Sequence, residues 1–431
     1  MSNLEINYHV KGNELVRVAR TDCLNGESSV ELQKPNFTID SEIELKKAWA
    51  SAQIVHEELI KHQIEKKTFK IVDVFSGCGG LSLGACGALQ SLGINQKFLA
   101  AVDIDDMALQ VYQRNFKPRA TLNMSAMRLV DYQLDGQGTE TNFPYVPEIL
   151  NNQLRDAVAN CDLLIGGPPC QGHSNLNNKT RRNDPKNQLY FTMPALAIAL
   201  NSPLLVIENV PEVLKDKTGV VEGTVSLLTK AGYFVDHCVI DGLRVGLSQT
   251  RKRHFLVASK YSQPNIIETV HALDMPSMVL DDVIGDLLNL GEEVSKFDQP
   301  ANLSTENHER INYLFEHDLY DLPNPQRPDC HKNGTTYKSV YGRLSLDKPS
   351  GTITTGFLSP GRGRYIHPTQ RRGLTPHEGA RIQSFPDSFR WLDDHGNHLK
   401  NTNYSKLIGD AVPPMLGKAA VLSALATFEE A

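Results

Sequence analysis

Long hydrophobic runs are missing from this sequence, and cysteine is scarce. Nowhere do about 18 apolar residues follow one another, and the first residues do not combine a basic stretch with an apolar one. Neither a membrane span nor an export signal is therefore expected. The seven cysteines are odd in number and include no C-x-x-C pair, which excludes a disulfide framework and a structural zinc site. We expect a protein of the reducing cytoplasm that binds no metal.

An excess of positive charge is missing as well. The formal net charge is −6, so composition alone does not suggest a nucleic-acid partner. Basic residues nevertheless gather locally, so charge can still be segregated on the surface. These clusters are Arg181-Arg182, Arg251-Lys252-Arg253, Arg362 with Arg364, and Arg371-Arg372. With 431 residues, of which 40% are hydrophobic, the chain is long enough for a large domain and a smaller one.

A glycine-rich turn opens the most regular part of the chain. Residues 69–75 are typical of a strand, and the glycine-rich run 76–84 passes into a helical pattern. Strand, glycine turn and helix together form the first unit of a doubly wound sheet, where backbone N–H groups can approach a ligand closely. A glycine-rich turn by itself is a weak signal.

The next strand ends in an acidic residue. Residues 98–102 are apolar, and Asp103, Ile104 and Asp105 follow them. An acid in this position can accept hydrogen bonds from the ribose hydroxyls of an adenosine cofactor, while Ile104 can cover one face of the adenine. The pattern predicts an adenosine-type ligand and does not separate NAD from S-adenosylmethionine.

The stretch 166–174 contains a candidate nucleophile. It follows the apolar run 162–165, so Cys170 is expected just beyond the carboxyl end of a buried strand, where open α/β sheets place reacting groups. Glu208 follows the apolar run 204–207 and is expected at a neighbouring strand end. Each residue alone is also compatible with a structural role, Cys170 as a small buried hydrophobe and Glu208 as a capping acid.

Taken together and in order, the motifs resemble those of the DNA cytosine-5 methyltransferase family. They are D-V-F-S-G-C-G-G at 73–80, G-G-P-P-C-Q-G at 166–172, E-N-V at 208–210, Q-T-R-K-R at 249–253, R-L through T-I-T-T from 343 to 355, and G-D-A-V-P-P at 409–414. The resemblance implies a doubly wound, Rossmann-like α/β sheet that binds S-adenosylmethionine, with a smaller target-recognition domain. It also implies methylation of a flipped-out cytosine at C5 in a specific double-stranded DNA sequence.

The resemblance assigns catalytic roles to four residues. Carbon 5 of cytosine is a weak nucleophile, so the ring must first be activated, and the thiolate of Cys170 would do this by adding to C6. Glu208 would protonate N3, and Arg251 and Arg253 would place guanidinium donors near the cytosine carbonyl. The sequence does not identify the base that removes the C5 proton.

The family motifs also imply cofactor and DNA contacts. The expected cofactor contacts are Phe75, Gly77, Gly79, Gly80, Leu81, Asp103, Ile104, Asn123, Pro169, Asp410, Ala411 and Val412. The chain departs from many relatives at two of them, because Asp410 stands where Asn is frequent and Asn123 where an acid is frequent. The expected DNA contacts are Gln171, Ser174, Arg181, Arg182, Gln249, Arg362 and Arg364.

We predict three parts of the chain. The first is an amino-terminal extension, residues 1–67, with an amphipathic helix over about 42–65. The second is the catalytic domain, made of residues 68–262 and 404–431. The third, residues 263–403, is the target-recognition domain with the ninth motif. Residues 131–155 are expected to be a surface insertion, and 346–366 to be β structure. Thr375 and Glu378 have capping-box spacing with Pro376 at the first helical position, which predicts a helix start.

Three alternatives remain open at this point. A tRNA-modifying branch of the same family shares the motifs, a non-catalytic DNA-binding relative would retain the fold, and a nicotinamide-dependent oxidoreductase would explain the glycine turn but not the later motifs. The resemblance favours a bacterial or phage enzyme that works as a monomer, with a cognate restriction endonuclease as a possible functional partner. The recognised bases are not readable from the sequence.

Overall fold

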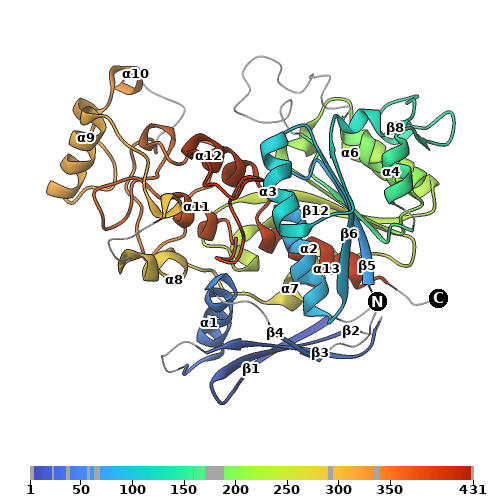
Figure 1. Cartoon of the computed structure of the whole chain (residues 1–431), viewed down its shortest axis with the longest axis horizontal. Coiled ribbons are helices and arrows are strands. Elements are labelled where there is room, and N and C mark those ends of the chain that lie inside the picture. Colours follow the sequence, from blue (N-terminus) through green and yellow to red (C-terminus); the bar gives the residue numbers. More distant parts are fainter. Residues whose placement is uncertain are drawn as a thin grey trace.

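The computed structural model describes residues 4–21, 24–34, 39–55, 59–62, 68–158, 160–169, 189–289, 295–332 and 339–428. Figure 1 shows three parts within these ranges: a large sheet flanked by helices, a part made of short helices and loops around α8–α12, and a small sheet with α1. None of the helices in these ranges is both long and apolar enough to cross a membrane.

A seven-stranded sheet forms the centre of the large part, in the order β12-β13-β11-β10-β5-β6-β7. Its strands are β5 (Thr68–Val74), β6 (Asn95–Asp103), β7 (Ala120–Asn123), β10 (Leu163–Gly166), β11 (Leu204–Asn209), β12 (Phe234–Asp241) and β13 (Lys252–Ser259). The pairs among β11, β10, β5, β6 and β7 are parallel, whereas β13 runs antiparallel to both β11 and β12. The predicted α/β fold class is confirmed, and the carboxyl ends of the parallel strands share one edge with the beginning of β13.

Successive strand residues enter two different cores, one on each face of the sheet. Ile71 packs in one core and its neighbour Val72 in the other. The first core contains side chains of α2 (Gly80–Ser91), α3 (Asp106–Phe116), α7 (Ile266–Leu273) and α13 (Pro414–Leu425). The second contains side chains of α4 (Asn152–Ala157), α5 (Thr192–Ala199) and α6 (Val220–Lys230). Burial on both faces explains why these strands are continuously apolar in the sequence.

The predicted surface insertion at 131–155 is more integrated than expected. It contributes β9 (Glu148–Ile149), which pairs with β8 (Val130–Asp131), and the short helices η2 (Gly138–Glu140) and α4. Leu154 is completely buried in the second core. Lys230 Nζ donates to Thr141 O at 3.0 Å, which ties the segment to α6. Most of its residues are exposed, as expected of a surface insertion, and the sequence did not predict the elements that anchor it.

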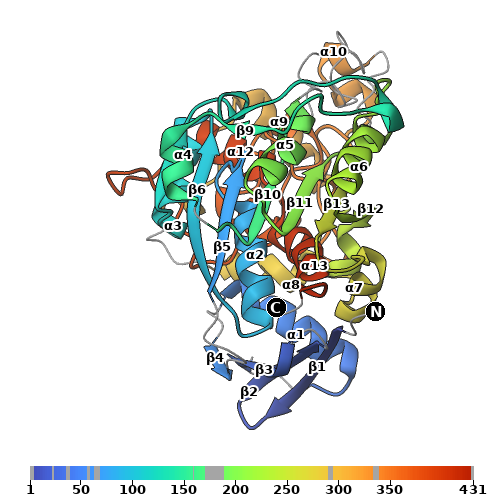
Figure 2. The ribbon, with the colours of Figure 1, turned by 90° about the vertical axis from the view of Figure 1, so that its right-hand side faces the viewer.

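The amino-terminal extension contains a four-stranded antiparallel sheet that the sequence analysis did not predict. Its strands are β1 (Leu4–Lys11), β2 (Glu14–Thr21), β3 (Leu24–Gln33) and β4 (Leu59–His62), and α1 (Glu42–Val55) packs on it. The predicted helix over about 42–65 is correct at its start and wrong at its end, because the chain returns as β4. Residues 4–62 are called the amino-terminal module below. Figure 2 shows it beneath the large sheet.

The part from 281 to 399, called the helical part below, is built from short helices. They are α8 (Asp281–Ile284), η6 (Gly285–Asn289), η7 (Lys296–Asp298), α9 (Thr305–Glu316), η8 (Asn324–Gln326), α10 (Asp329–Lys332), η9 (Pro360–Arg362) and α11 (Pro376–Ile382), and α12 (Asn401–Asp410) follows. The predicted β structure over 346–366 is wrong, because only isolated bridges occur there among the described residues. The predicted capping box is confirmed: Glu378 N–H donates to Thr375 Oγ1 at 3.1 Å, and Thr375 N–H donates to Glu378 Oε2 at 2.8 Å.

Candidate active site

Two charged side chains meet at the carboxyl edge of the large sheet. Glu208 lies at the end of β11, and Arg253 lies at the beginning of β13. Because β13 is antiparallel to β11, its first residues stand beside the last residues of β11. Arg253 Nε lies 2.9 Å from Glu208 Oε1, with the two side chains only 15% and 11% exposed. The sheet topology thus joins two predicted catalytic residues in a nearly buried ion pair.

The Glu208 carboxyl favours its protonated form more than an ordinary glutamate does. Burial raises its pKa, and the attraction of Arg253 and Arg251 offsets only part of that effect. Raised pKa values of this kind are frequent for carboxyl groups that act as general acids. The geometry therefore gives Glu208 the means to hold a proton and deliver it.

The segment that leads to Cys170 is held beside Glu208. A β-carbon at Gly167 would lie 3.2 Å from Glu208 Oε2, so the backbone approaches the carboxyl group closely. Asn209 Nδ2 donates to Pro168 O at 3.1 Å. The sequence analysis quoted Asn209 as part of the E-N-V motif and gave it no role, yet this side chain positions the segment. Its signal was its place directly after Glu208.

Several predicted residues lie outside the part of the chain that the structure describes. They are Cys170, Gln171, Ser174, Arg181 and Arg182, all within 170–188. Their assigned roles stay predictions.

Arg251 has a different use from the predicted one. It is buried, and its Nη1 donates to Ile353 O at 2.8 Å, while Nη2 donates to Ala411 O at 3.1 Å. Both terminal nitrogens also lie within hydrogen-bonding distance of Gly409 O. These donors face backbone carbonyls instead of a cytosine carbonyl, so Arg251 joins the beginning of β13 to two later motifs.

The prediction that Gln249 contacts DNA is wrong. The side chain is 0% exposed, and its Nε2 donates to Ile382 O at 2.8 Å and to Gln383 Oε1 at 2.7 Å. Its Oε1 accepts the Ile353 N–H at 3.3 Å. A fully buried side chain cannot reach DNA, and Gln249 instead connects the large sheet to α11.

The glycine turn adopts a conformation that needs its glycines. Gly77 has a φ of +52°, and its N–H donates to Asp103 Oδ2 at 2.8 Å. A β-carbon at Gly80 would lie 2.2 Å from Val412 O, and one at Gly79 would collide with the Phe116 ring. The turn, the end of β6 and the segment around Val412 therefore come together because these positions lack side chains.

The predicted adenosine contacts surround this turn. Asp103 Oδ1 accepts the Asp105 N–H at 2.9 Å, which orients the carboxylate, and a carboxylate retains further lone pairs for ribose hydroxyls. Ile104 is 75% exposed, which leaves its apolar surface available to an adenine. Asn123 Nδ2 donates to Asp103 O at 3.3 Å, so the amide oxygen is the end that can accept from a ligand.

The remaining predicted cofactor residues divide into two groups. Phe75, with a φ of +61°, Pro169 and Val412 are partly exposed. Leu81 and Ala411 are buried, and Leu81 packs near Gly417 of α13, so Leu81 supports the turn instead of offering its side chain to a ligand.

Two observations fit an adenosine-type cofactor at this turn. The hydroxyl of Ser76 is buried and has no hydrogen-bond partner among the described residues. Buried hydroxyls rarely stay unpaired, so a ligand atom at this turn would satisfy it. The exposed Ile104 on the neighbouring strand end is the second observation.

Lys406 compensates for the unusual Asp410. Its Nζ contacts Asp105 Oδ2 and lies 3.8 Å from Asp410 Oδ2. Asp410 adds a negative charge where Asn is frequent in relatives, and the sequence prediction did not include Lys406. The four-residue spacing from Lys406 to Asp410 on a helix was a usable signal. The extra carboxylate is therefore partly neutralised within the protein.

The two arginines of the 359–364 turn differ. Arg364 donates to Tyr320 O at 2.8 Å and to Arg343 O at 3.0 Å, and it pairs with Asp321, so its guanidinium is engaged within the helical part. Arg362 is exposed. Of these two predicted DNA contacts, Arg362 is the one whose charge faces solvent.

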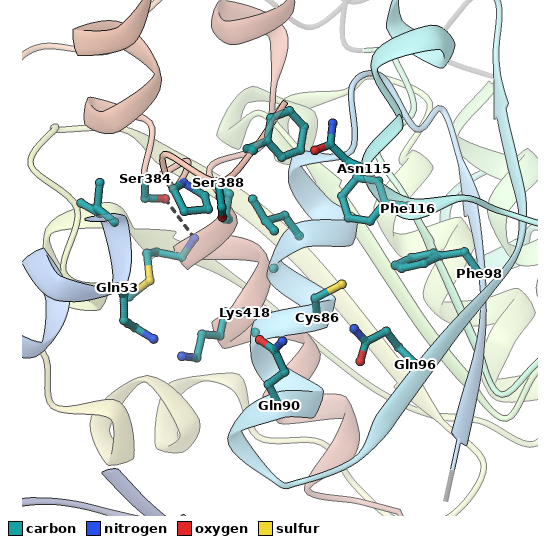
Figure 3. Close-up of a pocket in the computed structure, with 18 of the residues that line it drawn as sticks. Gln53, Cys86, Gln90, Gln96, Phe98, Asn115, Phe116, Ser384, Ser388 and Lys418 are labelled. Carbon is teal, nitrogen blue, oxygen red and sulfur yellow. Dashed lines mark hydrogen bonds between the residues drawn. The ribbon is translucent and has the colours of Figure 1, made fainter. Parts of the chain in front are cut away.

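Figure 3 shows a cavity of about 660 Å³ and the side chains that line it. Its walls come from α1, α2, α3, α13 and the loop at 384–389, and they include Gln53, Gln90, Phe116, Ser388 and Lys418. None of the predicted site residues lines it. The cavity is therefore not where Glu208 and Arg253 would act.

Comparison with known proteins identifies the family. Residues 69–424 match the model of the C-5 cytosine-specific DNA methylases. The chain is 39% identical over 365 residues to the Type II methyltransferase M1.BsuMI of Bacillus subtilis (strain 168), covering 84% of this chain and 82% of that protein. It is 31% identical to the Type II methylase M.HgiDII of Herpetosiphon aurantiacus, covering 82% and 94%.

Solved structures share the fold. The Entamoeba histolytica methyltransferase EhMeth has a TM-score of 0.53 at 18% identity, covering 85% of this chain and 100% of that one. The S. pombe Dnmt2 methyltransferase has a TM-score of 0.53 at 16% identity, covering 83% and 96%. With the family match over most of its length, the chain belongs to the C-5 cytosine-specific DNA methylases and is a DNA cytosine-5 methyltransferase.

Proposed function

We propose that this protein transfers a methyl group from S-adenosylmethionine to C5 of a flipped-out cytosine in double-stranded DNA, through a covalent adduct with Cys170. The observation that carries the proposal is the buried Glu208–Arg253 pair at the strand-end edge, 2.9 Å apart, with the segment before Cys170 packed against it. A carboxyl group with a raised pKa beside a cysteine-bearing segment is what cytosine activation requires.

The proposed reaction begins with addition of the Cys170 thiolate to C6, which breaks the C5–C6 double bond and moves electron density toward N3. Glu208 donates its proton to N3, so the ring carries no net negative charge. The electron-rich C5 then takes the methyl group. A base removes the C5 proton, the double bond reforms, the thiolate leaves C6, and the N3 proton returns to Glu208. Arg253 holds the carboxyl group in position throughout.

The glycine turn is the proposed cofactor site. S-adenosylmethionine supplies the methyl group when bound there. Gly77 and Gly80 keep the backbone open, Asp103 accepts from the ribose hydroxyls, and Ile104 covers the adenine. We include Phe75, Pro169, Asn123, Asp410 and the 411–412 backbone in the site.

We propose that DNA lies between the strand-end edge and the helical part. Arg362 is the proposed phosphate contact among the described residues. The other predicted DNA contacts, Gln171, Ser174, Arg181 and Arg182, lie outside the described residues and stay proposals. The boundaries at 67/68, 262/263 and 403/404 stay proposals. The names of the relatives support a modification enzyme that acts beside a restriction endonuclease, and we propose a cytoplasmic monomer for this chain.

Sequencing of plasmid DNA from expressing cells tests the proposal. Bisulfite treatment would reveal C5 methylation at one short motif with the intact protein and none with Cys170→Ala. Methylation that persists in Cys170→Ala would contradict the covalent route. If neither protein methylates DNA, methylation of tRNA by the intact protein in a parallel assay would support the RNA-modifying alternative.

A further inference from the structure

We propose that the amino-terminal module, residues 4–62, is a brace that holds the helical part in position against the large sheet and thereby sets DNA affinity. Lys46 is its main positioning residue. The module precedes the region that matches the family model, residues 69–424, so the family match assigns it no role. The proposal rests on the proposed function, because it assumes that DNA binds between the two parts.

The module contacts the segment that runs from the large sheet to the helical part, directly after α7. Lys46 of α1 is buried to 9% exposure, and its Nζ lies 2.6 Å from Asp274 Oδ2, directly after α7. The same Nζ lies 2.7 Å from Glu42 Oε1. Tyr8 of β1 adds a contact from its hydroxyl to Met275 Sδ at 3.5 Å. One lysine thus connects the module to the connector between α7 and α8.

A second set of contacts reaches the beginning of the helical part. Lys47 Nζ lies 3.2 Å from Asp282 Oδ2 in the first turn of α8, and Ser51 Oγ donates to Asp282 O at 2.7 Å. Lys46, Lys47 and Ser51 are spaced so that one side of α1 meets both ends of the connector. The connector is therefore held at 274 and at 282.

The module also contacts the segment that runs from the helical part back to the large sheet. Asp387 N–H donates to Ile54 O at the end of α1, at 2.8 Å. The Asp387 carboxylate in turn binds His377 Nε2 at 2.8 Å and Arg381 Nη2 at 2.6 Å, both on α11. This links the end of α1 to the core of the helical part.

The connector and α11 already share the first core with the large sheet, through Met275, Leu280 and Ile382. The contacts of the module with the outgoing and the returning segment add to that packing, and together they restrict how the helical part can move relative to the sheet. DNA in the proposed position must touch both parts, and its affinity includes the free-energy cost of fixing their relative position. A brace that fixes this position in the free protein lowers that cost. Loosening it should weaken DNA binding without changing Glu208 and Arg253, which lie on the large sheet.

A charge reversal tests the brace. Lys46→Glu would face Asp274 and Glu42 with a like charge, whereas the double variant Lys46→Glu with Asp274→Lys restores an opposite-charge pair. Lys11→Glu is the matched control, because Lys11 pairs within the module, with Glu31 at 3.8 Å. Methyl transfer to duplex DNA and DNA affinity by fluorescence anisotropy would be measured for each.

We expect Lys46→Glu to raise KM and Kd for DNA roughly three- to tenfold, with kcat and KM for S-adenosylmethionine unchanged. The double variant should recover most of the loss, and Lys11→Glu should behave as wild type. Unchanged DNA affinity in Lys46→Glu, or failure of the double variant to recover it, would overturn the brace. If wild-type protein transfers no methyl groups, the proposed function fails, while the Kd values still decide the brace.

Discussion

Two buried glutamates in this molecule have pKa values shifted in opposite directions. Glu208, at the edge of the large sheet, has one arginine in contact, and burial raises its pKa. Glu378, at the start of α11, is also buried, yet contacts from Arg372 and His367 outweigh burial, and its pKa is lowered to about 2. It also accepts the Thr375 N–H.

The difference shows how the number of donors around a buried carboxyl group decides its protonation. Glu378 has a bidentate arginine and a capping N–H, so its negative charge is satisfied and it serves stability. Glu208 has fewer donors around its buried carboxyl group, so its pKa is raised and it holds a proton more readily than an ordinary glutamate does. A strand-end acid and a helix-start acid thus have different uses.

Removal of the Glu208 carboxyl should give the largest effect. Glu208→Gln cannot donate a proton to N3, and we expect the single-turnover rate of methyl transfer to fall about 10²- to 10⁴-fold. Thermal stability should not fall, because the amide needs no buried charge. Glu140→Gln, an exposed glutamate in η2, is the control. A rate within a factor of two of wild type would remove Glu208 from the mechanism.

The same substitution at Glu378 should act on stability. Glu378→Gln leaves Arg372 without its anion and removes the carboxylate that lies 3.3 Å from His367 Nε2, and we expect a loss of about 3 kcal/mol in the free energy of unfolding at pH 7. Because the pKa is lowered from 4.5 to about 2, this stability is present above about pH 4.5 and is lost as pH falls toward 2. Denaturant titrations across pH should show the two proteins converging at low pH. A constant difference down to pH 2 would contradict the assigned cause.

The pH dependence of catalysis sharpens the contrast. Activity requires protonated Glu208, so the rate should fall as pH rises through its raised pKa. Arg253→Met removes the larger of the two arginine contributions that lower this pKa and leaves that of Arg251. The alkaline fall should therefore move upward by about one pH unit or more, at a reduced maximum rate. Single-turnover rates across pH measure it, with Lys252→Met as control. A fall that moves downward would reverse the assigned sign.

The smallest expected effect concerns Lys406, which faces two acids at the cofactor turn. Lys406→Met should raise KM for S-adenosylmethionine roughly two- to fivefold, since partly exposed ion pairs contribute little. Lys348→Met, an exposed lysine elsewhere, is the comparison. A simultaneous change in KM for DNA would mean that Lys406 acts on more than the cofactor site.

Motif order and strand patterns predicted the central sheet, the glycine turn and the pairing region of Glu208 and Arg253. Local signals were sufficient there, because an apolar run predicts a buried strand and a run of glycines predicts a turn that permits close contacts, whatever lies elsewhere in the chain. The same reasoning failed at β1, β2 and β3, where strands of mixed polarity depend on pairing partners for their stability. It also failed at 346–366, where bridges to distant segments replace a regular sheet.

By itself the sequence predicted the family and the doubly wound sheet, which are confirmed, and it proposed the reacting side chains. Only the tertiary structure decided that Gln249 and Arg251 are buried ties, that Lys406 neutralises Asp410, and that α1 contacts both segments between the sheet and the helical part. The physical reason is the distance along the sequence between the residues that interact. Strand and turn preferences arise from adjacent residues, whereas burial and charge pairing depend on residues that meet only after the chain has folded.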